Sequence, residues 1–215
     1  MTGSDVQLVQ SLSRGLAVIR AFDGERPRQS LAQVAEATGL PRATVRRFLH
    51  TLVAEGYAAS NGSVFWLTPK TLELGYSYLS SLGLPAIAQP HLDALSRTLN
   101  ESCSLTVLNT SDVVYVARAA ANRIMSVNIT IGTRFPAYVT SMGRVLLAGL
   151  PPAALDAYLA DTALRPFTPK TVTNPDELKQ LLIDVRRQGH CIVDQELELG
   201  LRSVTCPVRD SAGTA

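Results

Sequence analysis

The sequence predicts an α+β protein with a small helical N-terminal domain, a connecting helix and a larger domain of strands and helices. Three observations support this prediction. The first third of the chain shows three amphipathic helical patterns followed by a short hairpin pattern. A helical segment with apolar residues around nearly its whole circumference comes next. Beyond Pro85, strand patterns separated by turn-prone residues begin.

Residues 30–56 predict two short amphipathic helices joined by a glycine turn. Ser30 and Gln33 have the spacing of a capping box at the start of the first of these helices, and Gly39 ends it. Pro41 suits the beginning of the second helix, because an amide is not needed there. The apolar stripe of this second helix consists of Val45, Phe48, Leu49 and Leu52.

The opposite face of the second helix is basic and polar. It contains Arg42, Thr44, Arg46, Arg47 and His50. Such a face is often simply solvated. It is also the arrangement with which a recognition helix enters the major groove of DNA.

The elements on either side of this helix pair favour the DNA-binding interpretation. Upstream, the i, i+4, i+7 spacing of Leu12, Leu16 and Ile19 predicts another helix. Downstream, residues 57–67 predict a hairpin that turns at Asn61 and Gly62. Three helices followed by a hairpin is the order of a winged helix-turn-helix domain, here residues 1–68. We therefore expect double-stranded operator DNA as a partner, with Asn61 in the wing as a further contact.

A connecting helix is predicted for residues 69–84, after the capping pair Thr68–Pro69. Its apolar residues lie on nearly all sides: Leu72, Leu74, Tyr76, Tyr78, Leu79 and Leu82. Packing on its own domain would bury part of this surface, whereas burial between two subunits would cover all of it. Because DNA half-sites repeat, we expect a two-fold dimer.

Residues 85–215 predict an α/β domain with an antiparallel meander covered by helices on at least one side. A helix is expected to about Asn100, and then strands at 105–108, 113–118 and 125–129. The following segment, 129–141, is expected to be a loop. Further elements are helices at 142–150, 152–160 and 175–188 and strands at 190–194 and 203–208.

Composition agrees with this organisation. Residues 1–70 hold 8 Lys+Arg against 5 Asp+Glu, and residues 71–215 hold 12 against 13, so the basic excess lies with the helix pair. No apolar run approaches the roughly 20 residues that span a bilayer. Three cysteines without a CxxC spacing indicate neither a disulfide framework nor a metal site. The N-terminus lacks a signal-peptide layout, so we expect a cytoplasmic protein without a cofactor.

Four segments resemble the IclR family of bacterial transcription regulators: VQSLSRGLAVIRAF, LAQVAEATGLPRATVRRFLHTLVAEGY, GTRFPAYVTSMGRVLLAG and VDQELELGLRSVTCPVRD. The first and third look especially like regulators of the β-ketoadipate pathway, which respond to protocatechuate, 4-hydroxybenzoate or related acids. The resemblance implies a GAF/PAS-like effector domain, assembled as homodimers or tetramers. Family members usually continue beyond PVRDSAGTA with a strand and a helix, so we expect the effector domain, 85–215, to be incomplete.

Thr140 and Ser141 stand where a helix N-cap is expected, and the amides of Met142 and Gly143 would then attract a carboxylate. An ordinary helix start inside a core explains the same residues. The resemblance favours the ligand interpretation and implies effector contacts from Val127, Phe135, Ser141, Met142, Leu201 and Ser203.

Two further candidates come from side-chain chemistry alone. Arg134 could pair bidentately with a carboxylate, although it could equally be a plain surface residue. Tyr138 could hydrogen-bond a ring hydroxyl or stack on the ring. Aromatic surface beside anion-binding amides suits a hydroxybenzoate better than a short aliphatic acid, which remains the alternative.

An enzyme is the competing class. Asp194, Glu196 and Glu198 alternate like residues on one face of a strand, and paired carboxylates can act as acid and base. They can also be the solvated face of an edge strand. The sequence contains no phosphate-binding loop or metal-ligand spacing. We therefore expect a ligand-responsive DNA-binding regulator and no enzyme; a DNA binder without any ligand pocket is the third possibility.

Overall fold

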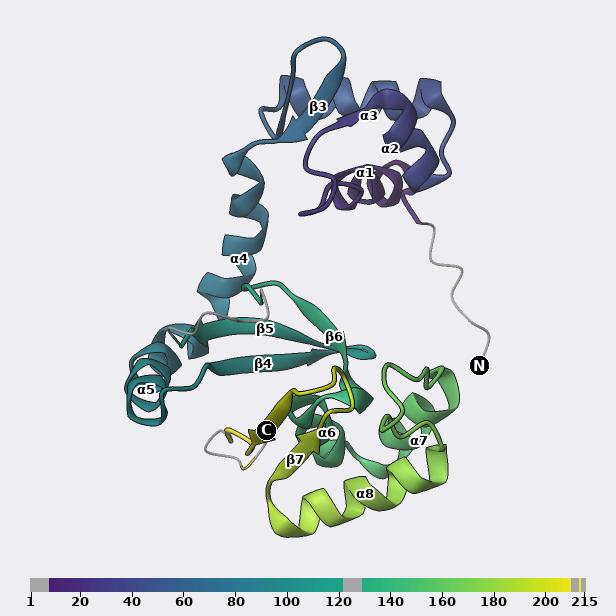
Figure 1. The fold of residues 1–215 in the computed structure, drawn as a ribbon. Helices are drawn as coiled ribbons and strands as arrows, with labels where there is room; N and C mark the ends of the chain where they lie inside the picture. The colour runs from purple at the N-terminus through teal and green to yellow at the C-terminus, as the bar shows by residue number, and fades with distance from the viewer. Residues whose placement is uncertain (1–7, 122–128, 210–212, 214–215) are drawn as a thin grey trace. The chain divides into compact units, whose positions relative to one another are not determined.

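The computed structural model describes residues 8–121, 129–209 and Gly213. The contacts within the chain define two compact units, Met1–Ser81 and Leu82–Ala215, both shown in Figure 1. The segment predicted as a separate connector lies almost entirely in the first unit. Within the described ranges, no helix combines the length and the apolar character that crossing a membrane requires.

The first unit begins with three helices and a small antiparallel sheet. The helices are α1 (Gln10–Arg20), α2 (Leu31–Thr38) and α3 (Arg42–Ala54), and the strands are β1 (Gln29–Ser30), β2 (Ala58–Ser60) and β3 (Val64–Leu67). The strand order is β1-β3-β2, so the predicted hairpin is confirmed and a two-residue strand joins its other edge. This is the winged helix-turn-helix arrangement that the sequence predicts.

The ends of α2 follow the predicted signals. The Ser30 hydroxyl accepts a hydrogen bond from the Gln33 amide at 3.4 Å, and the Gln33 side chain accepts one from the Ser30 amide at 2.8 Å, which completes the capping box. Gly39 ends the helix with φ +67°, a conformation that favours glycine. Pro41 is the N-cap of α3.

The core of the first unit lies between the three helices and β3. It consists of Val18, Ala21, Val34, Ala35, Val45, Leu49 and Phe65. Helix α1 confirms the helix predicted from the spacing of Leu12, Leu16 and Ile19. Its buried side is centred elsewhere, since Leu12 is 63% exposed and Leu16 44% exposed, while Val18 is fully buried. Apolar residues occur on more than one side of this helix, so spacing alone did not determine which side packs on α2 and α3.

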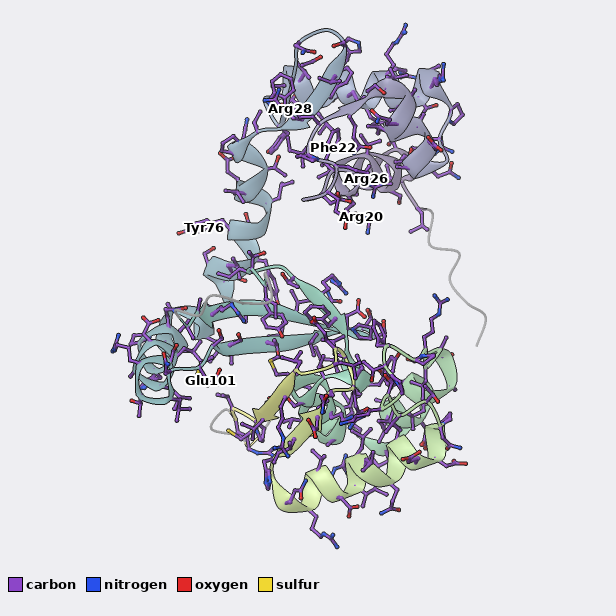
Figure 2. The ribbon with its side chains drawn as sticks, viewed as in Figure 1. Arg20, Phe22, Arg26, Arg28, Tyr76 and Glu101 are labelled. Carbon is purple, nitrogen blue, oxygen red and sulfur yellow. The ribbon has the colours of Figure 1, made fainter. Side chains whose placement is uncertain are left out.

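Helix α4 (Leu72–Leu82) follows a 3-10 turn, η1 (Pro69–Thr71), and confirms the predicted helix. Its apolar side chains are largely uncovered in the single chain. Leu72 is 75% exposed and Tyr76 70% exposed, and Tyr76 projects away from the helix in Figure 2. So many large apolar side chains exposed on one helix are unusual on a monomer.

The second unit begins with α5 (Leu84–Leu99), which packs on the strands β4 (Cys103–Asn109) and β5 (Asp112–Ala119). Strand β6 (Arg134–Pro136) pairs with β5, giving the antiparallel order β4-β5-β6. This segment was expected to be a loop; backbone pairing with β5 makes it a strand despite Pro136. The expected strand at 125–129 and Val127 fall, except for Ile129, outside the described residues.

The remaining elements of the second unit pack around a central helix. They are η2 (Ala137–Val139), α6 (Ser141–Gly149), α7 (Pro152–Asp161), α8 (Pro175–Gln188) and the hairpin β7 (Cys191–Asp194) with β8 (Arg202–Thr205). Helix α6 contacts η2, α8 and both hairpin strands, and its Leu147 is fully buried among them. Helix α6 also contacts β4, so its first turn and β8 lie near the meander (Figure 1).

Candidate nucleic-acid interface and ligand pocket

Helix α3 has two chemically distinct faces. Val45 and Leu49 are fully buried, as the predicted stripe requires. Four of the polar candidates, Arg42, Arg46, Arg47 and His50, are exposed, and Thr44 is half-buried. Four of the five candidates are therefore accessible from solvent on α3. His50 also contacts Phe65 of the wing edge-on, with ring centroids 6.4 Å apart.

The wing presents a turn and a cation beside α3. The Asn61 side-chain oxygen accepts hydrogen bonds from the amides of Ser63 at 3.1 Å and Val64 at 3.0 Å, so it holds the turn while its NH₂ group stays available. Arg28, labelled in Figure 2, lies over the Trp66 ring at 4.5 Å. Arg28, which directly precedes β1, was missed as a candidate, because the pairing of this two-residue strand with β3 leaves no signal in the sequence.

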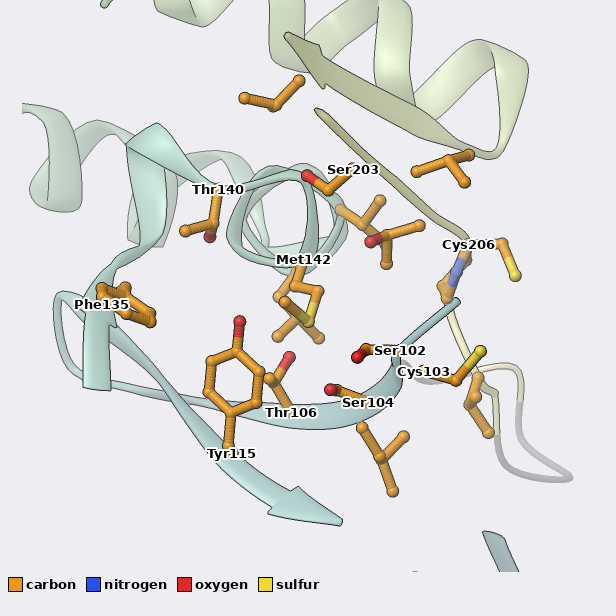
Figure 3. Close-up of a pocket in the computed structure, with 18 of the residues that line it drawn as sticks. Ser102, Cys103, Ser104, Thr106, Tyr115, Phe135, Thr140, Met142, Ser203 and Cys206 are labelled. Atoms are coloured by element: carbon orange, nitrogen blue, oxygen red, sulfur yellow. The ribbon is translucent and has the colours of Figure 1, made fainter. Parts of the chain in front are cut away.

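A cavity in the second unit lies between the β4–β5 strands on one side and α6 and β8 on the other (Figure 3). Its volume of about 2630 Å³ exceeds the roughly 300–1,000 Å³ typical of ligand pockets. Only a part of it is therefore needed for a small ligand. The part with the most varied chemistry is lined by Ser102, Ser104, Thr106, Tyr115, Arg118, Phe135, Thr140, Met142 and Ser203.

A β-bulge determines which side chains of β5 face this cavity. Leu105 pairs with Ala117 but Thr106 pairs with Tyr115, so one extra residue of β5 is accommodated. Regular alternation would place Tyr115 and Arg118 on opposite faces of the strand. The bulge instead places them on the same face, where Tyr115 is the cross-strand partner of Thr106 and Arg118 is the partner of Ser104.

Arg118 is half-buried and bonded to hydroxyl groups. Its Nη1 donates to the Ser104 hydroxyl at 3.2 Å and its Nη2 to the Ser102 hydroxyl at 3.3 Å. Sequence reasoning missed all three residues. The alternation of hydroxyl residues at Ser104 and Thr106 on β4 was the available signal, whereas the orientation of Arg118 depends on the bulge.

The aromatic side of the cavity consists of Tyr115 and Phe135, whose rings meet edge to face at 6.0 Å. Burial raises the pKa of Tyr115, and the positive charge of Arg118 opposes this shift more weakly. The phenol is therefore neutral at physiological pH. In Figure 3 its hydroxyl points into the cavity toward Met142.

Several polar groups of the first turn of α6 bond within the protein. Thr140 is the N-cap, as predicted, and its hydroxyl accepts a hydrogen bond from the Gly143 amide at 3.0 Å. The Gly143 amide is thus not free to bind a carboxylate, contrary to our expectation. The Ser141 hydroxyl donates to Ser203 at 2.8 Å and bonds Thr205 at the same distance, linking α6 to β8.

Of the seven predicted effector residues that the structure describes, five lie in or next to the cavity wall and two lie elsewhere. Phe135, Met142, Leu201 and Ser203 line the cavity, and buried Ser141 bonds Ser203.

Arg134 and Tyr138 do not belong to this lining. Arg134 follows the alternation of β6 away from Phe135 and forms an ion pair with Asp112 at 3.2 Å, which supports the surface interpretation. Tyr138 is 2% exposed because the η2 turn directs it into the core, where its hydroxyl donates to the Arg165 carbonyl at 2.7 Å.

The three acidic residues do not form a pair of catalytic carboxylates. Strand β7 ends at Asp194, and the positive φ of Gln195, +64°, breaks the expected alternation. Glu196 is buried and accepts two bonds from Arg144, at 2.7 and 2.6 Å, whereas Glu198 is exposed. Glu196 therefore has a structural role.

A winged helix-turn-helix unit followed by a unit whose cavity offers aromatic, hydroxyl and guanidinium groups to a small ligand defines a class of protein: DNA-binding regulators that respond to small molecules. The model described as the IclR helix-turn-helix domain matches residues 11–62, and the one described as bacterial transcriptional regulator IclR C-terminal matches residues 76–215. The chain belongs to the IclR family, whose members are transcription regulators and not enzymes.

Similar proteins agree with this assignment. The Pca regulon regulatory protein of Pseudomonas putida is 46% identical over 97% of this chain and 72% of its own length. The p-hydroxybenzoate hydroxylase transcriptional activator of Acinetobacter baylyi is 36% identical over 95% of this chain and 78% of its own.

Solved structures show the same fold. A transcriptional regulator from Rhodococcus sp. RHA1 is 59% identical, with a TM-score of 0.84 over 96% of this chain and 82% of that one. An IclR homolog from Microbacterium hydrocarbonoxydans, complexed with 4-hydroxybenzoate, also reaches 0.84 over 95% and 85%, at 24% identity. The predicted α+β class, with a winged helix-turn-helix and an effector domain, is confirmed.

Proposed function

We propose that this regulator binds operator DNA through α3 and its wing, and that an aromatic carboxylic acid in the cavity of the second unit controls that binding. The observation that supports this most directly is the cavity itself, where the rings of Tyr115 and Phe135 lie on the same wall as the hydroxyl-bonded guanidinium of Arg118. A hydroxylated benzoate offers the matching groups. The name of the Acinetobacter baylyi relative, a p-hydroxybenzoate hydroxylase transcriptional activator, points to the same chemistry and to a gene of aromatic metabolism.

We propose that the protein acts as a homodimer in the cytoplasm, where its DNA is. The exposed apolar residues of α4, of which Leu72 and Tyr76 are the most exposed, offer a surface that a second copy would bury. Two recognition helices per dimer would then contact two half-sites. Because coupling between two binding sites is reciprocal, operator DNA must change the affinity for the acid by the same factor as the acid changes the affinity for DNA.

The DNA-binding part is tested with Arg46→Ala and Arg47→Ala. Fluorescence anisotropy on the promoter fragment next to the encoding gene should show binding weakened by about 10-fold or more for each. Arg97→Ala, an equally exposed arginine on α5, is the matched control and should bind like the parent. Parent-like binding by the double variant at Arg46 and Arg47 would contradict the role of α3.

The effector part is tested by calorimetry on the full-length protein. We expect 4-hydroxybenzoate or protocatechuate to bind in the micromolar range, about −8 kcal/mol, and glyoxylate to bind far more weakly. The acid should also alter the affinity for the promoter fragment and be recovered chemically unchanged. A preference for the short aliphatic acid would reject the aromatic effector while leaving DNA binding intact.

A further inference from the structure

We infer that Arg118, together with the hydroxyls of Ser102 and Ser104, binds the carboxylate of the effector. Ser104 lies on β4, Arg118 lies on β5 and Ser102 directly precedes β4. The two serines lie across the cavity from Thr140 (Figure 3). The inference rests on the proposed function, since it assigns a location to the acid group of the same ligand. It replaces the start of α6 as the anion site.

The charge of Arg118 is available for a ligand. Its guanidinium donates only to neutral hydroxyls in the described part of the chain, and no carboxylate there pairs with it. Arg202 and Arg209 also line the cavity, but both are exposed, and the Arg202 side chain is 71% exposed. A half-buried arginine is less screened by water and therefore attracts an anion more strongly.

The two serines add hydrogen-bond donors at the same place. A hydroxyl group has two acceptor positions and one donor. The Ser102 oxygen accepts from Arg118 at 3.3 Å and from the Ala121 amide at 3.1 Å, so its O–H is left to donate. Ser104 accepts from Arg118 and likewise retains its O–H. The guanidinium and the two hydroxyls can together donate hydrogen bonds to both oxygens of a carboxylate, which act only as acceptors.

The rest of the cavity fits an aromatic ring next to this anion site. The bulge places Tyr115 beside Arg118 on the cavity face of β5, with Phe135 packed edge-on against Tyr115. Ser104 and Thr106 are two residues apart on β4, roughly 7 Å along a strand, which is comparable to the length of a para-substituted benzoate. A ring anchored at Arg118 would therefore direct its hydroxyl toward Thr106 or Thr140.

The start of α6 is less suited to the carboxylate. The Thr140 hydroxyl already accepts a hydrogen bond from the Gly143 amide, and the Ser141 hydroxyl is hydrogen-bonded to Ser203 and Thr205. These groups hold α6 against β8. They can still contact a neutral ring hydroxyl through Thr140 or Ser203.

The test compares a charged ligand with its neutral counterpart. Calorimetry would measure 4-hydroxybenzoate and 4-hydroxybenzamide on the full-length parent and on Arg118→Ala. The variant should bind the acid about 10- to 100-fold more weakly, because hydrogen bonds to a charged group are lost, and the amide within about 3-fold of the parent. Arg134→Ala is the matched control: the same change in the same unit, at an exposed arginine outside the cavity, should leave both affinities unchanged.

The outcomes separate the two levels of the proposal. If the parent binds no aromatic acid, the aromatic effector and the Arg118 site both fail. If the parent binds 4-hydroxybenzoate and Arg118→Ala binds it equally well, or loses acid and amide alike, only the Arg118 site is rejected.

Two milder substitutions test the site if Arg118→Ala does not fold. Arg118→Lys keeps the charge but loses the planar fork, so it should weaken acid binding less than Arg118→Ala. Ser104→Ala should weaken the acid alone, by about 3- to 10-fold. Each melting temperature is measured first. Parent-like acid binding by both variants would overturn the site even if Arg118→Ala does not fold.

Discussion

Removing the charge of Glu196 should strongly destabilise the second unit. The Arg144 and Glu196 side chains are only 4% and 10% exposed, and two short hydrogen bonds join them. The Val172 amide also donates to Glu196, at 3.0 Å. Losing one partner of a buried ion pair costs about 3–5 kcal/mol, since the other charge stays buried. Glutamine retains the shape and one acceptor, so we expect a loss of about 3 kcal/mol for Glu196→Gln.

Urea unfolding followed by far-UV circular dichroism measures this loss. With a slope of about 2 kcal/mol per molar urea, the midpoint should fall by roughly 1.5 M. Glu198→Gln, an equal change at an exposed position nearby, should stay within about 0.5 kcal/mol of the parent. The single tryptophan, Trp66, reports on the first unit separately by fluorescence. Equal midpoints for the Glu196 and Glu198 variants would refute the structural role of the ion pair.

Three further predictions concern packing, assembly and pH. Gly143→Ala should lower the free energy of unfolding by more than about 2 kcal/mol in urea, since its Cβ would overlap the Ala137 carbonyl. At Gly75 a Cβ has open space, so Gly75→Ala should stabilise α4 by about 0.5–1 kcal/mol. Leu72→Asp should shift the proposed dimer toward monomer in light scattering, because it places a charge in the apolar surface. Burial raises the pKa of Tyr158 from 10.0 to about 12. The neutral phenol therefore favours the folded state below pH 10, and this contribution to the free energy of unfolding is lost between pH 10 and 12. Tyr158→Phe should reduce that alkaline loss of stability in urea unfolding.

Local signals in the sequence predicted most elements of the fold. The capping pair at Ser30, the glycine at the end of α2 and the stripe of α3 act within one or two helical turns, and the structure contains all of them. The prediction failed where partners distant in sequence decide. The segment containing strand β6 was expected to be a loop, and it is a strand because it pairs with β5.

The candidate ligand site was harder to predict than the fold. The residues taken from the family resemblance line the cavity where they are described, apart from Ser141 behind Ser203, because a shared fold keeps equivalent positions in place. Arg134 and Tyr138 were chosen for their chemistry alone, and alternation and a 3-10 turn direct them elsewhere. Arg118 was hidden because only a bulge, which the strand pattern does not reveal, places it beside Tyr115.

The most recognisable segment, GTRFPAYVTSMGRVLLAG, owes much of its pattern to packing. Gly143 is needed because the Ala137 carbonyl leaves no room for a side chain, and Thr140 caps the helix that begins there. Arg144 donates to the Tyr138 carbonyl at 2.8 Å and to Glu196, so it ties the turn, the helix and the chain after β7 together. These constraints are strict in residue type and would hold whatever the ligand. Ligand chemistry needs less specific residues, such as Ser102 and Ser104, which explains why a motif that identifies the family does not by itself locate the carboxylate.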